Sequence, residues 1–411
     1  MQQDYPVVVS KFRKLLTGTH IGSLASTIYP GLDERLWNRR RDREMREEVQ
    51  AAGYRSLPTY VQVPVADRPS HLIVVPPEGP GHESWRAGTR NFYYEAAQSA
   101  REKFGAEKVT VFAVNPDEHA EHWHVRLIKL AHEIGATHII THIESDPSSN
   151  NIAWTWDVLW SQLAPTWDGC LMGVMFDSSF TWITNKSRRL ARMSPNFLVV
   201  DICMPMDNSM VSGRSEVGPV NMPVSRESLK LIDDRIEGLP KLYDVSFIGA
   251  LYPDRVEALD RLRAEGLRVA VNPHRNDETR NLQDSRNNQP SYLDYMAGLA
   301  QSEMTINFSR SSAGPFEQMK TRVIEAALAG TLLLTDDQDR TRLFFKTDEE
   351  YAYFNLLSDL PEVVQRLMKD PARLAKMQLQ AKQRAREVAD TSFWGGVEEG
   401  LRLRGLPAFK S

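Results

Sequence analysis

Two glutamates in the second half of the chain, Glu317 and Glu325, have seven residues between them. A carboxylate can accept hydrogen bonds from both vicinal hydroxyls of a ribose, and dinucleotide enzymes use an acidic residue in this way. Glu325 stands in the apolar segment RVIEAALAG, so we expect it to be buried. Because a buried carboxylate needs a partner, Glu325 bonds either a ligand ribose or Arg322, one helical turn earlier.

The position of the helix start decides whether both glutamates can act together. We expect a strand over 304–308, a helix over 318–329 and a strand over 332–334. Residues eight positions apart in a helix are offset by roughly 80°, so one helix face would not hold both acids. If Glu317 lies in the loop before the helix, it can face a ligand while Glu325 is one or two turns in. Pro315 favours a start nearby, since proline is frequent in the first turn.

Basic residues and hydroxyls surround this pair. The loop SRSSAGPF contributes Ser309 and Arg310, and Lys320 and Arg322 follow shortly after. Backbone N–H groups at a helix start, together with these cations, can hold a diphosphate without a metal. The alternative is an ordinary surface loop, because loops of Ser and Gly are common. Arg275, in a polar loop over 272–290, is a further cationic candidate.

Three residues of the first half are candidate acid–base groups or acceptor contacts. His82 lies in the loop PPEGPGHES after a predicted strand over 71–75, where a GxGxxG fingerprint is absent. His142 and Asp177 also follow predicted strands. Side chains of these types at strand ends can serve as general bases in an active site. A surface turn for His82 and a helix cap for Asp177 are the plainer alternatives.

A metal site is not expected. His119 and His122 could share a helix face, but His124 is turned away, and no cysteine completes a tetrahedral set. The acidic pairs Glu144/Asp146 and Asp336/Asp337 are typical of solvated loops or caps. We therefore expect no metal and no cofactor.

Strands alternate with helices along most of the chain, which is typical of parallel α/β sheets. We predict two Rossmann-like, doubly wound parallel-sheet domains facing a cleft, the first over 71–240 with its linker and the second over 241–390. An N-terminal helical extension over 1–70 precedes them. We expect a C-terminal segment over 391–411 to pack back on the first domain. A ligand is expected in the cleft.

The composition indicates a globular protein of 411 residues that is 41% hydrophobic and 25% charged. The net charge of -4 argues against nucleic acid as a partner. Two cysteines and the lack of a signal peptide or an apolar run of membrane-spanning length indicate a cytoplasmic protein. The charged helix expected over 33–52 is explained by internal ion pairs, by a basic face for the inner membrane surface, or by a homodimer contact.

The second half resembles glycosyltransferases of the GT-B fold, most closely the CgeB-like (spore maturation protein) group. The segments that carry this resemblance are DVSFIGALYPDR at 244–255, MTINFSR at 304–310 and RVIEAALAGTLLLTDD at 322–337. The resemblance implies that the second domain binds a nucleotide-sugar, with Gly249 among the donor contacts. Retaining families carry two glutamates at this spacing, of which the second binds the ribose and the first the donor sugar. Here Gln318, Met319 and Lys320 replace the small residues expected after the first glutamate.

The predicted activity is transfer of a hexosyl or related glycosyl group to a glycan, lipid-linked or protein acceptor, metal-independent and retaining. A sugar-nucleotide epimerase or hydrolase of the same fold is one alternative. A non-catalytic partner in surface-glycan assembly is another.

Overall fold

The computed structural model describes residues 39–47, 60, 64–76, 92–114, 120–143, 155–176, 181–202, 216–218, 220–249, 251–273, 292–310 and 317–410. Residues 1–56 and 57–411 form two units, and each is described by itself. In the first unit, residues 39–47 are helical, and Arg40 Nε lies 2.6 Å from Glu44 Oε1. This ion pair supports the interpretation of the charged segment as a helix with internal pairing.

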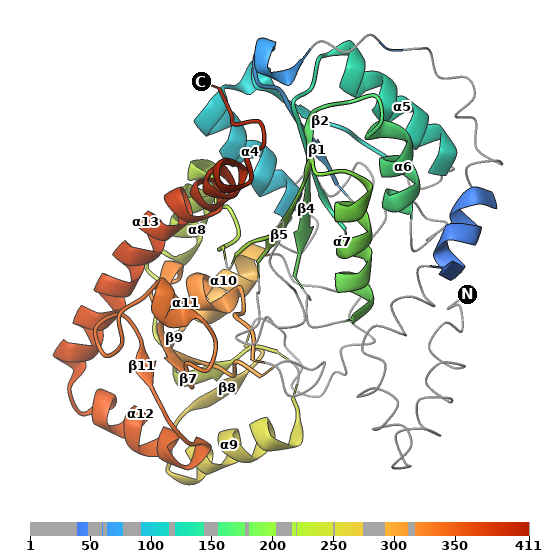
Figure 1. Ribbon diagram of the computed structural model, residues 1–411. Helices are drawn as coiled ribbons and strands as arrows, with labels where there is room; N and C mark the ends of the chain where they lie inside the picture. The colour runs from blue at the N-terminus through green and yellow to red at the C-terminus, as the bar shows by residue number, and fades with distance from the viewer. Residues whose placement is uncertain are drawn as a thin grey trace, which may run out of the picture. The chain divides into compact units, whose positions relative to one another are not determined.

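The first sheet of the larger unit is parallel throughout and has the order β2-β1-β3-β4-β5-β6 within the described residues. Its strands are β1 Leu72–Val75, β2 Val109–Val111, β3 His138–His142, β4 Cys170–Met175, β5 Phe197–Asp201 and β6 Glu216–Val217. The helices between them are α4 Phe92–Phe104, α5 Ala120–Glu133, α6 Thr155–Leu163 and α7 Thr181–Met193. Figure 1 shows these elements from blue through cyan to green.

The second sheet, also parallel, has the order β11-β10-β9-β7-β8. Its strands are β7 Tyr243–Phe247, β8 Val269–Val271, β9 Ser302–Asn307, β10 Leu332–Thr335 and β11 Ala352–Tyr353. The accompanying helices are α8 Arg226–Ile236, α9 Pro253–Ala264, α10 Tyr292–Ala300, α11 Arg322–Leu328, α12 Leu360–Met368 and α13 Pro371–Arg404. The predicted fold class, two Rossmann-like parallel sheets with flanking helices, is confirmed.

Alternation along the strands of the second sheet builds one core on each face. Leu332 and Leu334 of β10 pack with α9, α12 and the start of α13. Leu333, between them, packs on the opposite face with α8, α10, α11 and the middle of α13. Successive strand side chains point to opposite faces, so the apolar run LLL requires helices on both sides of the sheet.

Helix α13 runs unbroken from Pro371 to Arg404 and ends at Gly405, which adopts the left-handed conformation. Its last turns contribute Phe393, Trp394 and Val397 to the core of the first sheet, beside α4. The C-terminal segment over 391–411, expected to follow the second domain, continues this helix as far as Arg404. The Gly395–Gly396 pair does not end the helix, because the apolar residues around it stay on one buried stripe.

A buried carboxylate ties α4 to the start of α8. Glu95 is fully buried and accepts hydrogen bonds from the Ser225 backbone N–H (2.6 Å) and from the Ser228 hydroxyl. Ser225 is also the N-cap of α8, since its side chain accepts from the Ser228 N–H. Such side-chain bonds satisfy N–H groups that have no partner within the helix.

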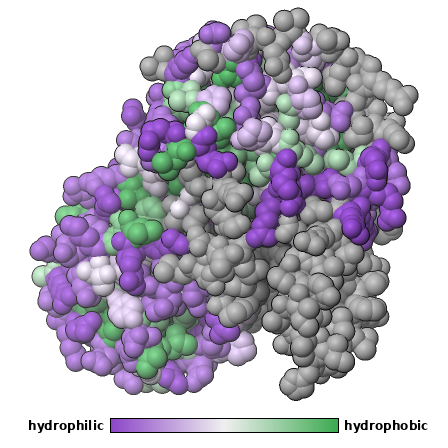
Figure 2. Space-filling model, in the orientation of Figure 1, coloured by the Kyte–Doolittle hydropathy of each residue, from purple (hydrophilic) through white to green (hydrophobic). Residues whose placement is uncertain are grey.

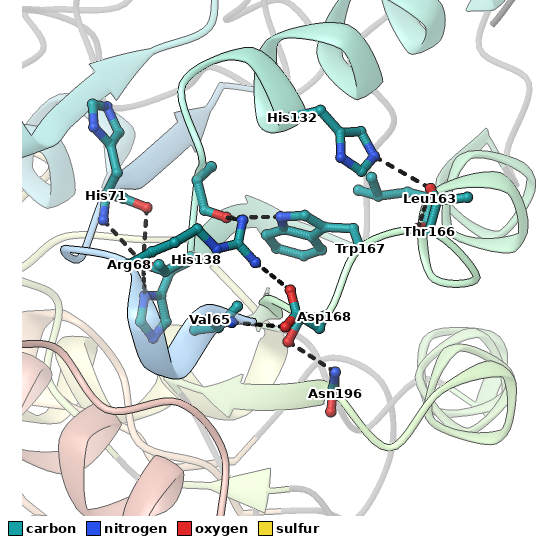
Figure 3. Close-up of polar contacts among 12 residues, drawn as sticks. Val65, Arg68, His71, His132, His138, Leu163, Thr166, Trp167, Asp168 and Asn196 are labelled. Carbon is teal, nitrogen blue, oxygen red and sulfur yellow. Dashed lines mark hydrogen bonds and ion pairs between the residues drawn. The ribbon is translucent and has the colours of Figure 1, made fainter. Parts of the chain in front are cut away.

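The amino ends of β1, β3 and β4 are joined by polar contacts with a structural role (Figure 3). Asp168 accepts from the Val65 N–H at 2.7 Å and pairs with Arg68. The Trp167 indole N–H donates to the Ala136 carbonyl at 2.7 Å, and the His71 N–H donates to Thr137 Oγ1 at 3.0 Å. These bonds occupy the edge of the sheet opposite to the one where α/β proteins bind ligands.

The linker expected at the end of the first domain, before residue 241, contains β6 and α8. Strand β6 has two residues, as does β11, and so short a strand carries no detectable alternation. Helix α8 is amphipathic, with Ser228 and Ile232 as its buried residues. Ile232 packs in the same core as α10.

Figure 2 shows hydrophilic and hydrophobic side chains mixed over the visible face of the described residues. Among the described residues, no helix combines the length and apolar character needed to cross a membrane. Cys170 is buried in the core of the first sheet, which raises the pKa of its thiol. Cys203 lies outside the described residues.

Candidate donor site

The strand order of the second sheet places its switch point between β7 and β9, whose connections lead to opposite sides. Ligands of open α/β sheets bind beyond the carboxyl ends of the strands at this point. Ile248 and Gly249 follow β7 there, Phe308 and Ser309 follow β9, and Asp336 follows β10. The candidate site is built from these residues and from the first turns of α9 and α11.

Arg322 is the first residue of α11, and its Nη2 donates a hydrogen bond to the carbonyl of Ile248. Its guanidinium carbon lies 5.4 Å from the centre of the Phe247 ring. Its Nε is buried and has no hydrogen-bond partner in the described part of the chain. A cation held in this way at a switch point favours an anionic ligand.

Gly249 adopts a φ of +149°, which side chains rarely permit. A Cβ at this position would lie 3.2 Å from Arg322 Nη2 and 3.2 Å from Phe247 Cζ. The Gly249 N–H donates to Asn272 Oδ1 at 2.9 Å, so the loop after β7 is tied to the end of β8. The predicted donor contact Gly249 therefore lies directly beside Arg322.

Arg255, in the first turn of α9, is a second cation at the site and was not among the predicted residues. Its guanidinium carbon lies 4.5 Å from the Tyr252 ring centre, 5.3 Å from that of Phe308 and 5.6 Å from that of Phe247. Burial, followed by repulsion from Arg322, lowers the pKa of Arg255. Both arginines therefore lie over Phe247. Arg255 ends the segment DVSFIGALYPDR, which was the available signal in the sequence.

Glu317 lies outside α11. The backbone of Glu317 forms an isolated antiparallel bridge with that of Arg310, and the Gln318 N–H donates to the Ser309 carbonyl at 3.1 Å. The helix predicted over 318–329 begins only at Arg322, because the backbone of residues 317–318 is used in this pairing. The Ser309 hydroxyl donates to Glu317 Oε2 at 2.6 Å. Glu317 thus satisfies the condition for facing a ligand from the loop.

Glu325 lies in the first turn of α11 and is 4% exposed, as expected from its apolar neighbours. Its Oε2 accepts a hydrogen bond from the Tyr295 hydroxyl at 2.9 Å. Tyr295 belongs to α10 and was not singled out in the sequence. The carboxylate is therefore oriented by the neighbouring helix.

Asp336 meets the same loop from β10. Its Oδ2 accepts from the Ser309 N–H at 3.3 Å, and burial raises the pKa of its carboxyl group. Asp337, next to it, is a structural residue that accepts from the Tyr351 hydroxyl at 2.8 Å and pairs with Arg342 at 3.1 Å. The acidic pair was expected in a solvated loop or a cap, but Asp337 is 4% exposed and burial affects Asp336, so the solvated-loop interpretation is wrong.

The remaining predicted residues are distributed as follows. Arg310 is exposed, and its carbonyl accepts from Arg255 Nη2 at 3.3 Å. Lys320 is half-buried two residues before α11. His142 is half-buried at the carboxyl end of β3, edge-on to Phe176 with ring centres 5.2 Å apart. His82, Arg275 and Asp177 lie outside the described residues.

The histidine cluster contains a core residue. His124 is 2% exposed and packs edge-on against Trp123, with ring centres 4.1 Å apart. Burial lowers the pKa of His124 well below its usual value, so its imidazole is neutral. His122 is exposed on the same helix, and His119 lies outside the described residues.

Residues 248–391 match the family model described as "Glycosyl transferase-like". This part of the chain is therefore similar in sequence to that family. The match covers about a third of the 411 residues and contains Gly249, Arg255, Arg322 and Glu325. No curated protein matches the chain. The finer resemblance to the CgeB-like group stays a prediction.

Solved structures share the fold. An alpha-glucosyltransferase in complex with UDP and a 13-mer DNA matches with a TM-score of 0.52 and 12% identity, covering 82% of this chain and 100% of that chain. Anabaena HepE in complex with UDP and glucose matches at a TM-score of 0.46 and 13% identity, covering 82% and 99%. Sucrose-phosphate synthase from Thermosynechococcus elongatus matches at 0.48 and 13%, covering 82% and 99%. The alpha-glucosyltransferase likeness identifies the fold as GT-B.

Proposed function

We propose that the protein is a GT-B glycosyltransferase that moves a hexosyl or related sugar from a nucleotide-sugar to a glycan, lipid-linked or protein acceptor. The observation that carries this proposal is the pair Arg255 and Arg322 over Phe247, with the Glu325 carboxylate one helical turn from Arg322. Cations beside a carboxylate suit a nucleoside diphosphate, which combines phosphate charge with ribose hydroxyls.

The donor then lies with its ribose hydroxyls on Glu325 and its diphosphate between the two guanidinium groups. Negative charge develops on the diphosphate as the glycosidic bond breaks. Fixed cations stabilise that charge without reorganising, and a single donor of this kind is worth about 3 kcal/mol in comparable sites. Glu317, held by the Ser309 hydroxyl, contacts the donor sugar from the loop. This arrangement needs no metal.

The acceptor enters from the first domain in this proposal, with His142 as the described residue on that side. The net charge of -4 favours an acceptor other than nucleic acid, although the alpha-glucosyltransferase of similar fold was solved with DNA. Retention of the anomeric configuration follows if Glu317 acts as proposed. Inversion would require a base such as His142, His82 or Asp177. The place of action is proposed to be the cytoplasm, including the inner membrane surface.

Thermal unfolding with UDP, GDP, dTDP and CMP sugars tests the proposal. We expect one nucleotide class to raise the unfolding temperature, and Glu325→Gln to abolish that rise while staying folded by circular dichroism. Glu349→Gln, at an exposed position in the same domain, is the matched control. No shift with any donor would support the non-catalytic alternative. Donor turnover without an acceptor would support an epimerase or hydrolase.

A further inference from the structure

We propose that Tyr295 is a positioning residue that orients the Glu325 carboxylate toward the vicinal hydroxyls of the donor ribose. This inference rests on the proposed function, because it assigns a second residue to the same ribose contact. The Tyr295 hydroxyl donates to Glu325 Oε2 at 2.9 Å, from a different helix. The two helices pack together in one core.

The chemistry of the hydroxyl fits this role. Burial, and next the charge of Glu325, raise the pKa of Tyr295 well above its usual value, whereas Arg322 lowers it. The phenol therefore stays protonated and donates to the carboxylate. The Tyr295 hydroxyl lies beside Glu325, the proposed partner of the ribose, and beside Arg322, the proposed partner of the phosphates.

The Glu325 side chain is on a short helix, and its terminal torsion is broad when nothing holds it. A fixed donor on Oε2 restricts that torsion and so sets the direction of Oε1. An oxygen of a carboxylate accepts more than one hydrogen bond, so Oε2 can bond Tyr295 and a ligand hydroxyl together. Both ribose hydroxyls then meet an acceptor whose direction is set before binding, which reduces the entropy cost of binding.

The Tyr295 ring is held independently of its hydroxyl. It stacks on Tyr292, with ring centres 5.7 Å apart and an angle of 24° between the planes. Tyr295→Phe keeps this stacking and removes the hydroxyl that contacts Glu325 and Arg322. The matched control is Tyr353→Phe, because the Tyr353 hydroxyl donates to exposed Asn355 at 3.0 Å, away from the site.

The measurement is the affinity ratio between a ribonucleoside diphosphate and its 2′-deoxy counterpart, taken by calorimetry with UDP against 2′-deoxy-UDP and GDP against 2′-deoxy-GDP. The wild-type chain is expected to prefer the ribose form of one pair by about tenfold, the value of one charged hydrogen bond. Tyr295→Phe should weaken that ribonucleotide and reduce the preference to about twofold, whereas Tyr353→Phe should retain it.

A folded Tyr295→Phe protein with the wild-type ratio would overturn this inference alone and leave the donor site in place. A wild-type chain that binds neither nucleotide pair would overturn the proposed function as well. An equal loss of affinity for the ribonucleotide and the 2′-deoxyribonucleotide in Tyr295→Phe would show that Tyr295 acts only through packing, and would also overturn the inference.

Discussion

Arg322 and Glu325 lie one helical turn apart at the start of α11, and both interact with Tyr295 of α10. Arg322 also donates to the Ile248 carbonyl at the end of β7, and Glu325 accepts from the Tyr295 hydroxyl. In the proposed donor site, Arg322 meets the diphosphate and Glu325 meets the ribose.

Gly249→Ala should disrupt the donor site without unfolding the second domain. The new Cβ would stand 3.2 Å from Arg322 Nη2 on a backbone with φ of +149°. We expect a loss of about 1–3 kcal/mol in stability from backbone strain and a nucleotide affinity at least tenfold weaker. Urea unfolding and calorimetry measure the two effects. Gly266→Ala, at φ +80° with no atom near its Cβ, is the control for strain alone. Equal nucleotide affinity in both variants would contradict the prediction.

Arg255→Gln should weaken binding of inorganic diphosphate and of nucleoside diphosphates by about 10- to 100-fold, because a charged hydrogen bond contributes about 1.5–3 kcal/mol. The remaining affinity should depend less on salt, since one charge fewer faces the anion. Titrations at two ionic strengths provide the test. The control is Arg261→Gln on the same helix, where Arg261 pairs with exposed Glu257 at 2.6 Å. The assignment of Arg255 fails if both variants bind diphosphate alike.

The sequence predicted the parallel sheets and the burial of Glu325 because βα alternation and apolar runs are local signals. It did not predict the contacts that orient the site. Whether Glu317 is helical depends on a backbone bridge to Arg310, and the role of Tyr295 depends on the packing of α10 on α11. Both are tertiary relationships. Arg255 ends the segment DVSFIGALYPDR, but one of the aromatic rings that it contacts, Phe308, follows β9 and is distant in the sequence.

Glu95→Gln should destabilise the larger unit by about 2 kcal/mol or more. The fully buried carboxylate accepts from both the Ser225 N–H and the Ser228 hydroxyl. In the glutamine variant, the side-chain NH2 group would replace one acceptor oxygen and would face one of these two donors, so a hydrogen bond would be lost. Denaturant unfolding measures the change. Glu102→Gln is the control, because Glu102 accepts from the Arg226 N–H at 3.0 Å in an exposed position and should cost under about 1 kcal/mol. Equal losses of unfolding free energy in Glu95→Gln and Glu102→Gln would contradict the prediction.

Asp339→Asn should alter the pH dependence of stability between pH 4 and 6. Burial, opposed by bonds from the Thr341 hydroxyl and N–H, raises the pKa of Asp339 from 3.8 to about 6. A raised pKa means that the folded chain binds the proton more tightly than the unfolded chain does. The associated stability is therefore present in full below about pH 4 and is lost as the pH rises through 6.

The protonated carboxyl of Asp339 and an amide in its place resemble each other at this site. Oδ1 accepts from the Thr341 N–H at 2.8 Å and hydroxyl at 2.6 Å, whereas Oδ2 faces Asn307 Nδ2 at 3.3 Å. Asn307 Oδ1 is buried without a hydrogen-bond partner in the described part of the chain, so a flip of that amide offers an acceptor to a new N–H. Relative to wild type, the variant should gain up to about 3 kcal/mol between pH 4 and 7. Urea unfolding across this range tests it, with exposed Asp260→Asn as control; parallel curves for wild type and Asp339→Asn would contradict the assignment.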